Sequence, residues 1–207
     1  MVWLTMAMLG LTLSQAVPHA PMWPFQFSAN LTVFVSSSRA ELLLGYYLYD
    51  YVNLNFKREL ICRGCSEHRI DVFTQVPGDL LEFREYWIFN RPSGDGMQCI
   101  ASKKFMYSNL FKPPNWIAAE RYEFEQRLVI TDIEGRSLQA FGWKSPFGFS
   151  YYETAEENPL HRIPIKYEMI DRDARQVEVF MSHFKATAPD YDDLTSLSDS
   201  WNCPSLR

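Results

Sequence analysis

The sequence predicts a mainly β protein built from antiparallel strands, and three observations carry this prediction. Apolar and polar residues alternate with period two in several segments, which places one set of side chains on a buried face and the other in water. Turn residues separate these segments at intervals of roughly ten to twenty residues, which favours hairpin meanders over βαβ units. Aromatic residues, which strands prefer, make up 15% of the 207 residues.

Six segments show the alternation, and turn signals such as Pro77-Gly78-Asp79 and Asn158-Pro159 lie between them. The predicted strands cover residues 25–35, 42–48, 69–76, 122–130, 163–169 and 177–181. One short helix is predicted over 190–201, because Asp192 and Asp193 stand near its start, where carboxylates favour a helix. A C-terminal tail follows and is expected to be held in place by Cys203.

Several predicted strands carry aromatic side chains on both faces, as in residues 46–51, 86–89 and 147–152. A sheet of this composition has both faces covered, or has one face that lines a cavity. A filled two-layer core is the alternative to a cavity.

The first twenty residues contain no Lys, Arg, Asp or Glu, and residues 2–13 are almost entirely apolar. Small residues follow at Ser14 and Ala16, as at the cleavage site of a secretory signal peptide. The alternative, a buried N-terminal helix, conflicts with Pro18, Pro21 and Pro24. We therefore expect a signal peptide at 1–16, a single β-rich domain at 17–207, and a secreted, extracellular or lysosomal protein.

Charge and length exclude several classes of partner. The net charge is −5, and acidic and basic residues are interspersed, so no basic stripe predicts a nucleic-acid partner. The apolar N-terminal run is shorter than the roughly 20 residues that span a bilayer, and no later segment is long enough either.

The four cysteines, Cys62, Cys65, Cys99 and Cys203, predict two disulfides, because their number is even and the chain carries an export signal. Since tight Cys-x-x-Cys rings are usually redox-active, we expect the pairs Cys65–Cys99 and Cys62–Cys203. The alternative is a zinc site formed by Cys62, Cys65, His68 and Cys99. Export favours disulfides, so no bound metal is expected.

Asn30-Leu31-Thr32 is a glycosylation sequon. Asn30 is out of phase with the apolar odd-numbered residues of its predicted strand, so it should face water and carry a glycan.

No catalytic constellation is present in the sequence. It lacks a nucleophile elbow, a P-loop and a dinucleotide fingerprint, and none of its four histidines pairs with another at i+4. We therefore expect no catalytic residues, no cofactor and no enzymatic activity.

A series of short motifs follows one another in a recognisable order along the chain. They are Gly45-Tyr46-Tyr47-Leu48-Tyr49-Asp50-Tyr51 with Lys57-Arg58 after it, Gln98-Cys99, Pro113-Pro114-Asn115-Trp116, Phe141-Gly142-Trp143, Tyr151-Tyr152 and Ile163-Pro164-Ile165. In this order of features the chain resembles the ependymin-related and eukaryotic LolA-like secreted protein family. One departure is that no cysteine lies near Pro164, so the family's disulfide pattern does not transfer.

The resemblance implies an antiparallel β half-barrel, open on one side, with short helical segments and an apolar cleft for a lipid or another hydrophobic small molecule. It is compatible with peripheral contact with a membrane. The side chains expected to line the cleft are Trp87, Tyr122, Phe124, Trp143, Phe149 and Tyr151, with Arg84 or Arg127 at the mouth for an anionic ligand. Ordinary core packing is the alternative for each of them.

Two other functions stay open from the sequence. One is an extracellular interaction or adhesion domain with a filled core, and the other is a secreted hydrolase whose site has no recognisable motif.

Overall fold

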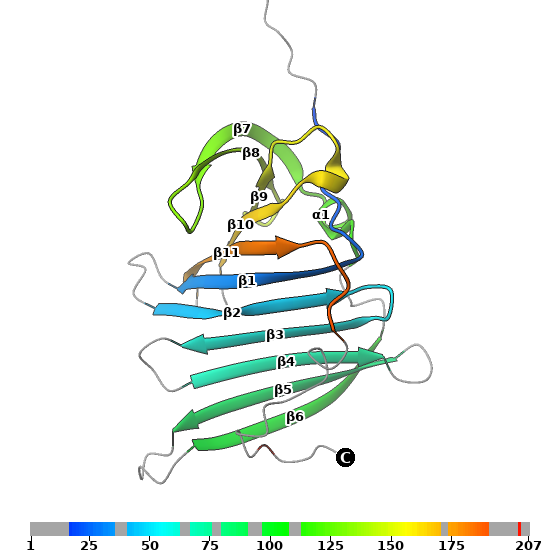
Figure 1. Ribbon diagram of the computed structural model, residues 1–207, viewed down its shortest axis with the longest axis vertical. Helices are drawn as coiled ribbons and strands as arrows, with labels where there is room; N and C mark the ends of the chain where they lie inside the picture. The colour runs from blue at the N-terminus through cyan, green and yellow to red at the C-terminus, as the bar shows by residue number, and fades with distance from the viewer. Residues whose placement is uncertain are drawn as a thin grey trace, which may run out of the picture.

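Eleven antiparallel strands form one sheet in the computed structural model, with a one-turn helix and a 3-10 turn beside it (Figure 1). The structure describes residues 17–35, 41–62, 67–75, 80–90, 97–107, 113–170, 174–190 and Cys203. The elements are β1 (Gln26–Val35), β2 (Glu41–Asp50), β3 (Asn55–Cys62), β4 (Glu67–Gln75), β5 (Leu80–Asn90), β6 (Met97–Tyr107), α1 (Trp116–Ala119), β7 (Glu123–Thr131), β8 (Ser137–Lys144), β9 (Ser150–Thr154), η2 (Pro159–His161), β10 (Pro164–Ile170) and β11 (Gln176–Lys185).

The first and last strands of the chain pair with each other in the middle of the sheet. The strand order is β6-β5-β4-β3-β2-β1-β11-β10-β9-β8-β7, so the sheet consists of two meanders joined at β1 and β11. We call β1–β6 the first limb and β7–β11 the second limb. β6 and β7 stand at the two ends of this order, so the described sheet does not close into a barrel.

The predicted mainly β, antiparallel class is confirmed, and each of the six predicted strands corresponds to an observed one. β1 shows why the alternation predicted a strand. Its odd-numbered residues from Phe27 to Val35 are all buried, whereas Asn30 is exposed. Residues 1–16, with the predicted signal peptide, lie outside the described residues. The predicted helix at 190–201 also lies outside them, apart from Asp190.

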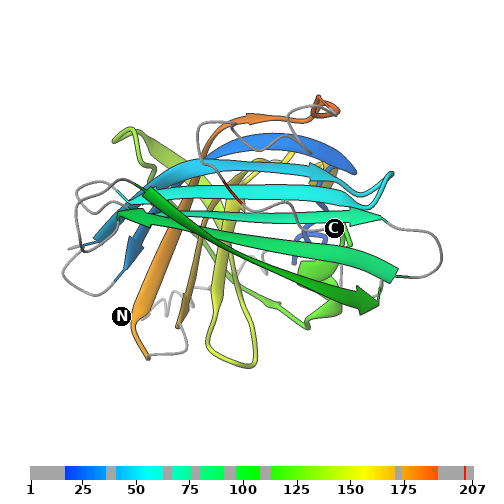
Figure 2. The same cartoon turned by 90° about the horizontal axis from the view of Figure 1, so that it is seen from below.

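The two faces of the sheet have different surroundings. Side chains from distant strands, such as Leu81 on β5 and Trp143 on β8, belong to one core on the face that we call the inner face. Figure 2 shows how this arises, because β8–β11, drawn yellow to orange, run steeply across the direction of β2–β5. On the opposite, outer face, Ile70, Tyr86 and Ile88 form a smaller core.

The predicted disulfide pairing is wrong. Cys99 on β6 is bonded to Cys203, with 5.0 Å between their Cα atoms, and both pack against the outer-face core. Cys62 lies on β3, about 14 Å away at three strand spacings, which exceeds the reach of a disulfide from Cys99. Cys65 and the side chain of Cys62 lie outside the described residues. The prediction failed because sequence spacing does not show which strand lies next to Cys203 in the fold.

Cys203→Ser should lower the free energy of unfolding by about 2–4 kcal/mol, because the Cys99–Cys203 bond closes a segment of 104 residues. It should also expose one additional reactive thiol, that of Cys99. Urea unfolding and thiol titration measure the two effects.

Cys99→Ser serves as the matched control, and the double variant should be no less stable than either single one. Non-reducing peptide mapping that recovers a Cys65–Cys99 peptide would contradict the observed bond.

Candidate functional site on the inner face

The part of the inner face near the start of β1 is filled by the protein's own aromatic side chains. Trp23 packs edge-on against Phe27, with 5.2 Å between ring centroids, and against Trp116 of α1, with 5.3 Å. Its indole Nε1 donates a hydrogen bond of 2.9 Å to the hydroxyl of Tyr151 on β9. The segment before β1 is fixed to the segment before α1 by a bond from Trp23 N to Pro114 O. This segment and α1 therefore occupy the space between the limbs here.

Four of the predicted ligand-lining residues belong to this filled region. Tyr151 is 0% exposed and Trp143 is 3% exposed, so neither offers surface to a ligand in this structure. Tyr122 packs on Trp116, and Phe124 packs on Trp143. Trp143 and Tyr151 serve as core, which is the alternative stated for them from the sequence, whereas Tyr122 and Phe124 are partly buried and pack against that core.

The other predicted residues are scattered. Phe149 is half-buried in the turn before β9, where its backbone N–H bonds to Ser145 Oγ. Arg84 lies on the outer face and forms an ion pair with Glu82. Arg127 is exposed on β7, with its guanidinium 5.8 Å from the ring centre of Phe141.

Trp87 is the one predicted aromatic that keeps a large accessible surface, since 52% of it is exposed. It lies on β5 at the parity of Leu81, which is the inner face, and Ile100 stands directly opposite on β6 and is also half exposed. The indole Nε1 of Trp87 donates to Glu85 Oε1 at 3.2 Å. The two side chains form an accessible apolar wall toward the β6 edge.

Between the filled region and this wall, apolar inner-face side chains are only partly buried. They come from both limbs and are Leu43, Tyr47, Phe56, Leu60, Tyr167 and Met169. These side chains pack against the inner-face core and keep some access to water among the described residues, and an accessible apolar group of this kind is a candidate contact surface. We call this group the half-buried apolar surface.

Arg58 lies within the half-buried apolar surface and was missed by the sequence analysis. It stands opposite Tyr47 in the β2–β3 register, and its side chain is itself half-buried. Tyr167 on β10 packs against the same inner-face core as Tyr47, and it lies close enough to Arg58 for the arginine's charge to lower its pKa. The sequence contained a sign of this position. Arg58 stands between Phe56 and Leu60 in the alternating set of residues that faces the apolar side of the strand.

Loss of hydration raises the pKa of both Tyr47 and Tyr167, and the positive charge of Arg58 opposes the rise. For Tyr47 the neighbouring Tyr167 raises the pKa further. Both hydroxyls therefore stay protonated near neutral pH. Next to the guanidinium they supply hydrogen-bond donors.

The strand register continues from Arg58 into a polar row across the first limb. The row runs from Tyr47 through Arg58, Asp71 and Glu85 to Ser102 on β6. Ser102 Oγ is buried and has no hydrogen-bond partner among the described residues. A buried hydroxyl left unbonded costs about 1–3 kcal/mol.

The next inner-face row, two residues along the strands, is largely apolar. Its members include Leu31, Leu60, Trp87 and Ile100, and register adds Gly45 and Arg69. A polar row beside an apolar row suits an amphiphilic ligand.

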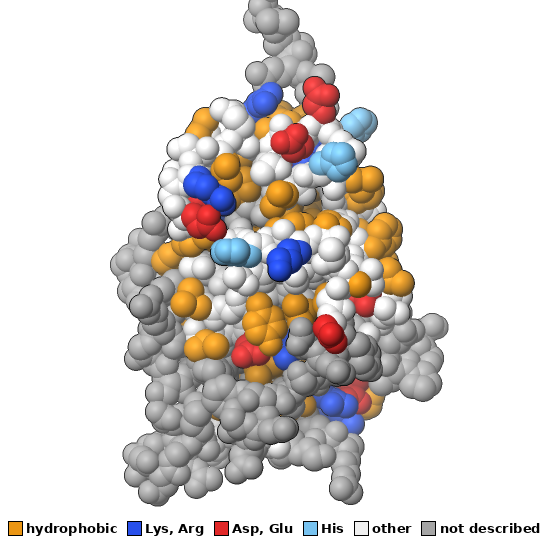
Figure 3. All heavy atoms as spheres, viewed as in Figure 1, with side chains coloured by type: hydrophobic (Ala, Val, Ile, Leu, Met, Phe, Trp, Pro, Cys, Tyr) orange, Lys and Arg blue, Asp and Glu red, His pale blue; other side chains and the backbone are white. Residues whose placement is uncertain are grey.

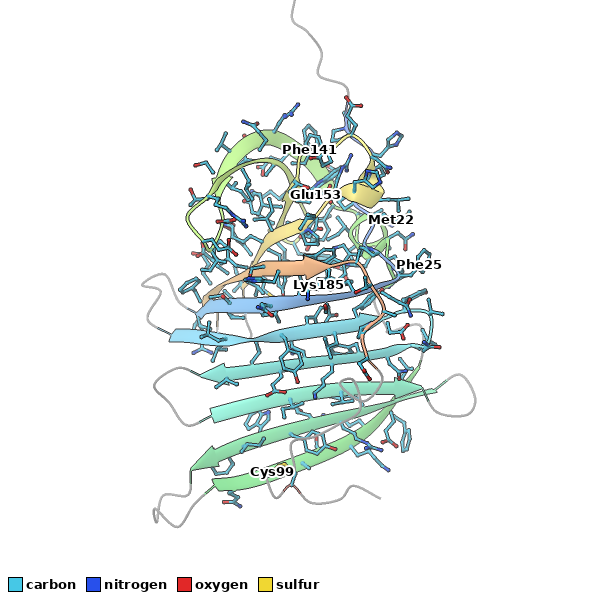
Figure 4. All side chains as sticks on the ribbon, in the orientation of Figure 1. Met22, Phe25, Cys99, Phe141, Glu153 and Lys185 are labelled. Atoms are coloured by element: carbon cyan, nitrogen blue, oxygen red, sulfur yellow. A yellow bond between two sulfur atoms is a disulfide. The ribbon has the colours of Figure 1, made fainter. Side chains whose placement is uncertain are left out.

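A buried ion pair lies in the second limb. Arg162 is 3% exposed and donates from Nη1 to Glu153 Oε1 at 2.9 Å, and Glu153 is 2% exposed. Trp143 Nε1 donates to the same carboxylate oxygen at 3.1 Å, and the guanidinium lies 4.8 Å from the ring centre of Phe141. Figure 4 shows Glu153 beside Phe141, its register partner, far from Cys99 at the other end of the molecule.

The same arginine attaches the N-terminal segment to the fold. Arg162 Nη1 donates to the carbonyl oxygen of His19 at 2.6 Å, and Nε donates to that of Glu156 at 2.7 Å. All these bonds stay within the protein, so Arg162 and Glu153 have a structural role.

The described residues offer little else that indicates chemistry. They contain no group of three or more His, Cys, Asp or Glu side chains placed to hold a metal ion. Neither α1 nor η2, the helices of the described part of the chain, is long and apolar enough to cross a bilayer. On the outer face, apolar side chains are scattered among charged ones (Figure 3).

Comparisons with known proteins leave the chain without a family. No known protein family matches the sequence, and no curated protein matches it either. Among solved structures, the chain is similar to an uncharacterized conserved protein from Thermus thermophilus. The TM-score is 0.48 at 13% identity, and the match covers 87% of this chain and 90% of that one. A likeness of this degree carries no argument about fold or function.

Glu153 should make the protein more stable in mild acid. Burial raises the pKa of Glu153 to about 7 from its ordinary 4.5, although Arg162 and Trp143 oppose the rise. The protonated form is thus favoured in the fold, and the stabilisation is complete below pH 4.5 and is lost as the pH rises through 7. We expect the free energy of unfolding to fall by about 1–3 kcal/mol between pH 5 and pH 8.

Glu153→Gln should flatten this pH profile, measured by urea unfolding at each pH, and Glu125→Gln on β7 should leave it unchanged. A wild-type protein whose unfolding free energy rises with pH over this window would contradict the assignment. Arg162→Leu, which leaves a buried carboxylate unpaired, should cost about 3–5 kcal/mol at pH 8.

Proposed function

We propose that this chain is a secreted or endolysosomal glycoprotein that binds a hydrophobic ligand, of the lipid class, on the inner face of a β half-barrel. The observation that carries the proposal is the half-buried apolar surface, with Trp87 and Ile100 beside it. Such a surface gains about 25 cal/mol for each Å² of apolar area that a ligand covers. Tyrosine and tryptophan suit this lining because each combines an apolar ring with a polar tip.

The sheet supports the half-barrel in a specific way. Its two limbs share one core on the inner face, while β6 and β7 remain apart at the ends of the described strand order. The sequence resemblance to the ependymin-related and LolA-like proteins fits this proposal, since it implies the same open barrel. The filled region around Trp23 limits the ligand to the part of the inner face near β2–β6 and β10.

The Cys99–Cys203 bond fits an extracellular location, because structural disulfides persist in oxidising compartments. The raised pKa of Glu153, which predicts greater stability in mild acid, also suits an endolysosomal protein.

Organic extracts of the native protein from a eukaryotic host should contain a lipid, identified by mass spectrometry. Leu60→Glu or Met169→Glu places a charge on the half-buried apolar surface and should weaken binding of a fluorescent fatty-acid probe by about ten- to a hundredfold, because each removes a buried apolar side chain worth about 1.5–3 kcal/mol.

Leu44→Glu, an exposed outer-face position on β2, is the matched control and should bind the probe as the wild type does. Extracts without lipid, together with no probe binding by the wild type, would reject the function and favour an interaction domain with a filled core.

Asn30 should carry a glycan in protein secreted from a eukaryotic host. It is exposed on the outer face, where its Nδ2 atom lies 3.4 Å from His183 Nδ1. Glycosidase treatment should increase gel mobility, Asn30→Gln should abolish this change, and N-terminal sequencing should begin near Val17. A cytosolic product that retains Met1 and lacks a glycan would contradict secretion.

A further inference from the structure

Arg58 is placed where a lipid on the inner face would have its head group. It is the described side chain that brings a full positive charge into the half-buried apolar surface, between Phe56 and Leu60 on its own strand. A guanidinium is costly to remove from water unless it is bonded, and it bonds most strongly to oxyanions, which it can hold through two parallel N–H donors.

Neutral donors converge on the same place from both limbs. Tyr47 is the direct cross-strand neighbour of Arg58, and Tyr167 approaches from β10 on the facing limb. Donors are what an anionic oxygen needs, and these come from β2 and β10, beside Arg58 on β3.

The carboxylates of the polar row do not remove this capacity. Asp71 is the register neighbour of Arg58 on β4, and Glu85 accepts a hydrogen bond from Trp87 Nε1. A guanidinium has five N–H donors, so Arg58 can hold one carboxylate and still bind a second oxyanion. In the row beside it, Leu60, Trp87 and Ile100 keep accessible apolar surface where an acyl chain would run, and Arg69 stands in register between Leu60 and Trp87.

We propose that the ligand is an anionic amphiphile with one acyl chain, whose carboxylate or phosphate head group is bound by Arg58 with the hydroxyls of Tyr47 and Tyr167. The proposal rests on the lipid-binding function proposed above and names the ligand class and the residue that selects it. Arg84 and Arg127, the arginines predicted from the sequence, lie on the outer face and at the exposed β7 edge.

The test compares ligands that differ only in charge. Calorimetric titration of the full-length protein with oleate and with oleyl alcohol should give at least tenfold tighter binding of oleate. Arg58→Gln should weaken oleate binding at least tenfold and change oleyl alcohol binding less than twofold. Tyr167→Phe should weaken oleate binding by about threefold.

Arg84→Gln on the outer face is the matched control and should leave both affinities unchanged. Arg58→Lys, which keeps the charge without the two parallel donors, should bind oleate with intermediate affinity and provides the measurement if Arg58→Gln does not fold. Oleoyl lysophosphatidate in a parallel titration identifies whether a phosphate or a carboxylate is preferred.

The outcomes separate the two proposals. The role of Arg58 would be overturned if the wild type bound oleate and oleyl alcohol with equal affinity. It would also be overturned if Arg58→Gln lost equal affinity for the two ligands. Either result would still leave a lipid-binding protein. A wild-type protein that binds none of the three lipids would reject the proposed function itself.

Discussion

The pairing of β1 with β11 is the interaction on which the rest of the structure depends. β1 and β11 are the first and last described strands in chain order, and they pair in the middle of the sheet. Their register runs from Ser28–Lys185 to Val35–Val177. Without it the chain would form two separate meanders, each with one apolar face open to water. With it the two limbs share one inner-face core, and Tyr167 on β10 comes within electrostatic reach of Arg58 on β3.

The inner face shows how one core can serve two purposes. Near the start of β1, Trp23 and Trp116 fill the space between the limbs, and the indole of Trp23 bonds to Tyr151. Tyr47 packs against Trp23 at the edge of this filled region, and Tyr47 and Leu60 are both only partly buried. The filled region supplies stability, which leaves the accessible region able to expose apolar area that a simple core would bury.

Charged groups are also found both in the filled core and in the partly accessible surface of the inner face. Arg162 and Glu153 are satisfied by each other, by Trp143 and by backbone carbonyl oxygens, so they fasten the second limb and the N-terminal segment. Arg58 instead lies in a surface that is partly accessible, beside hydroxyl groups that stay protonated. The first pair is a structural element, and the second arrangement is suited to a ligand.

The sequence by itself determined six of the eleven described strands, because the period-two alternation that it carries is a local property of the chain. It also predicted the exposure of Asn30. Three matters were decided only by the tertiary structure: which aromatic residues fill the core, which side of the sheet Arg84 occupies, and which cysteine meets Cys203. Each depends on which segments distant in sequence meet in the folded chain, as Cys99 and Cys203 do. Local alternation sets the parity of a side chain but cannot show which distant segment covers it.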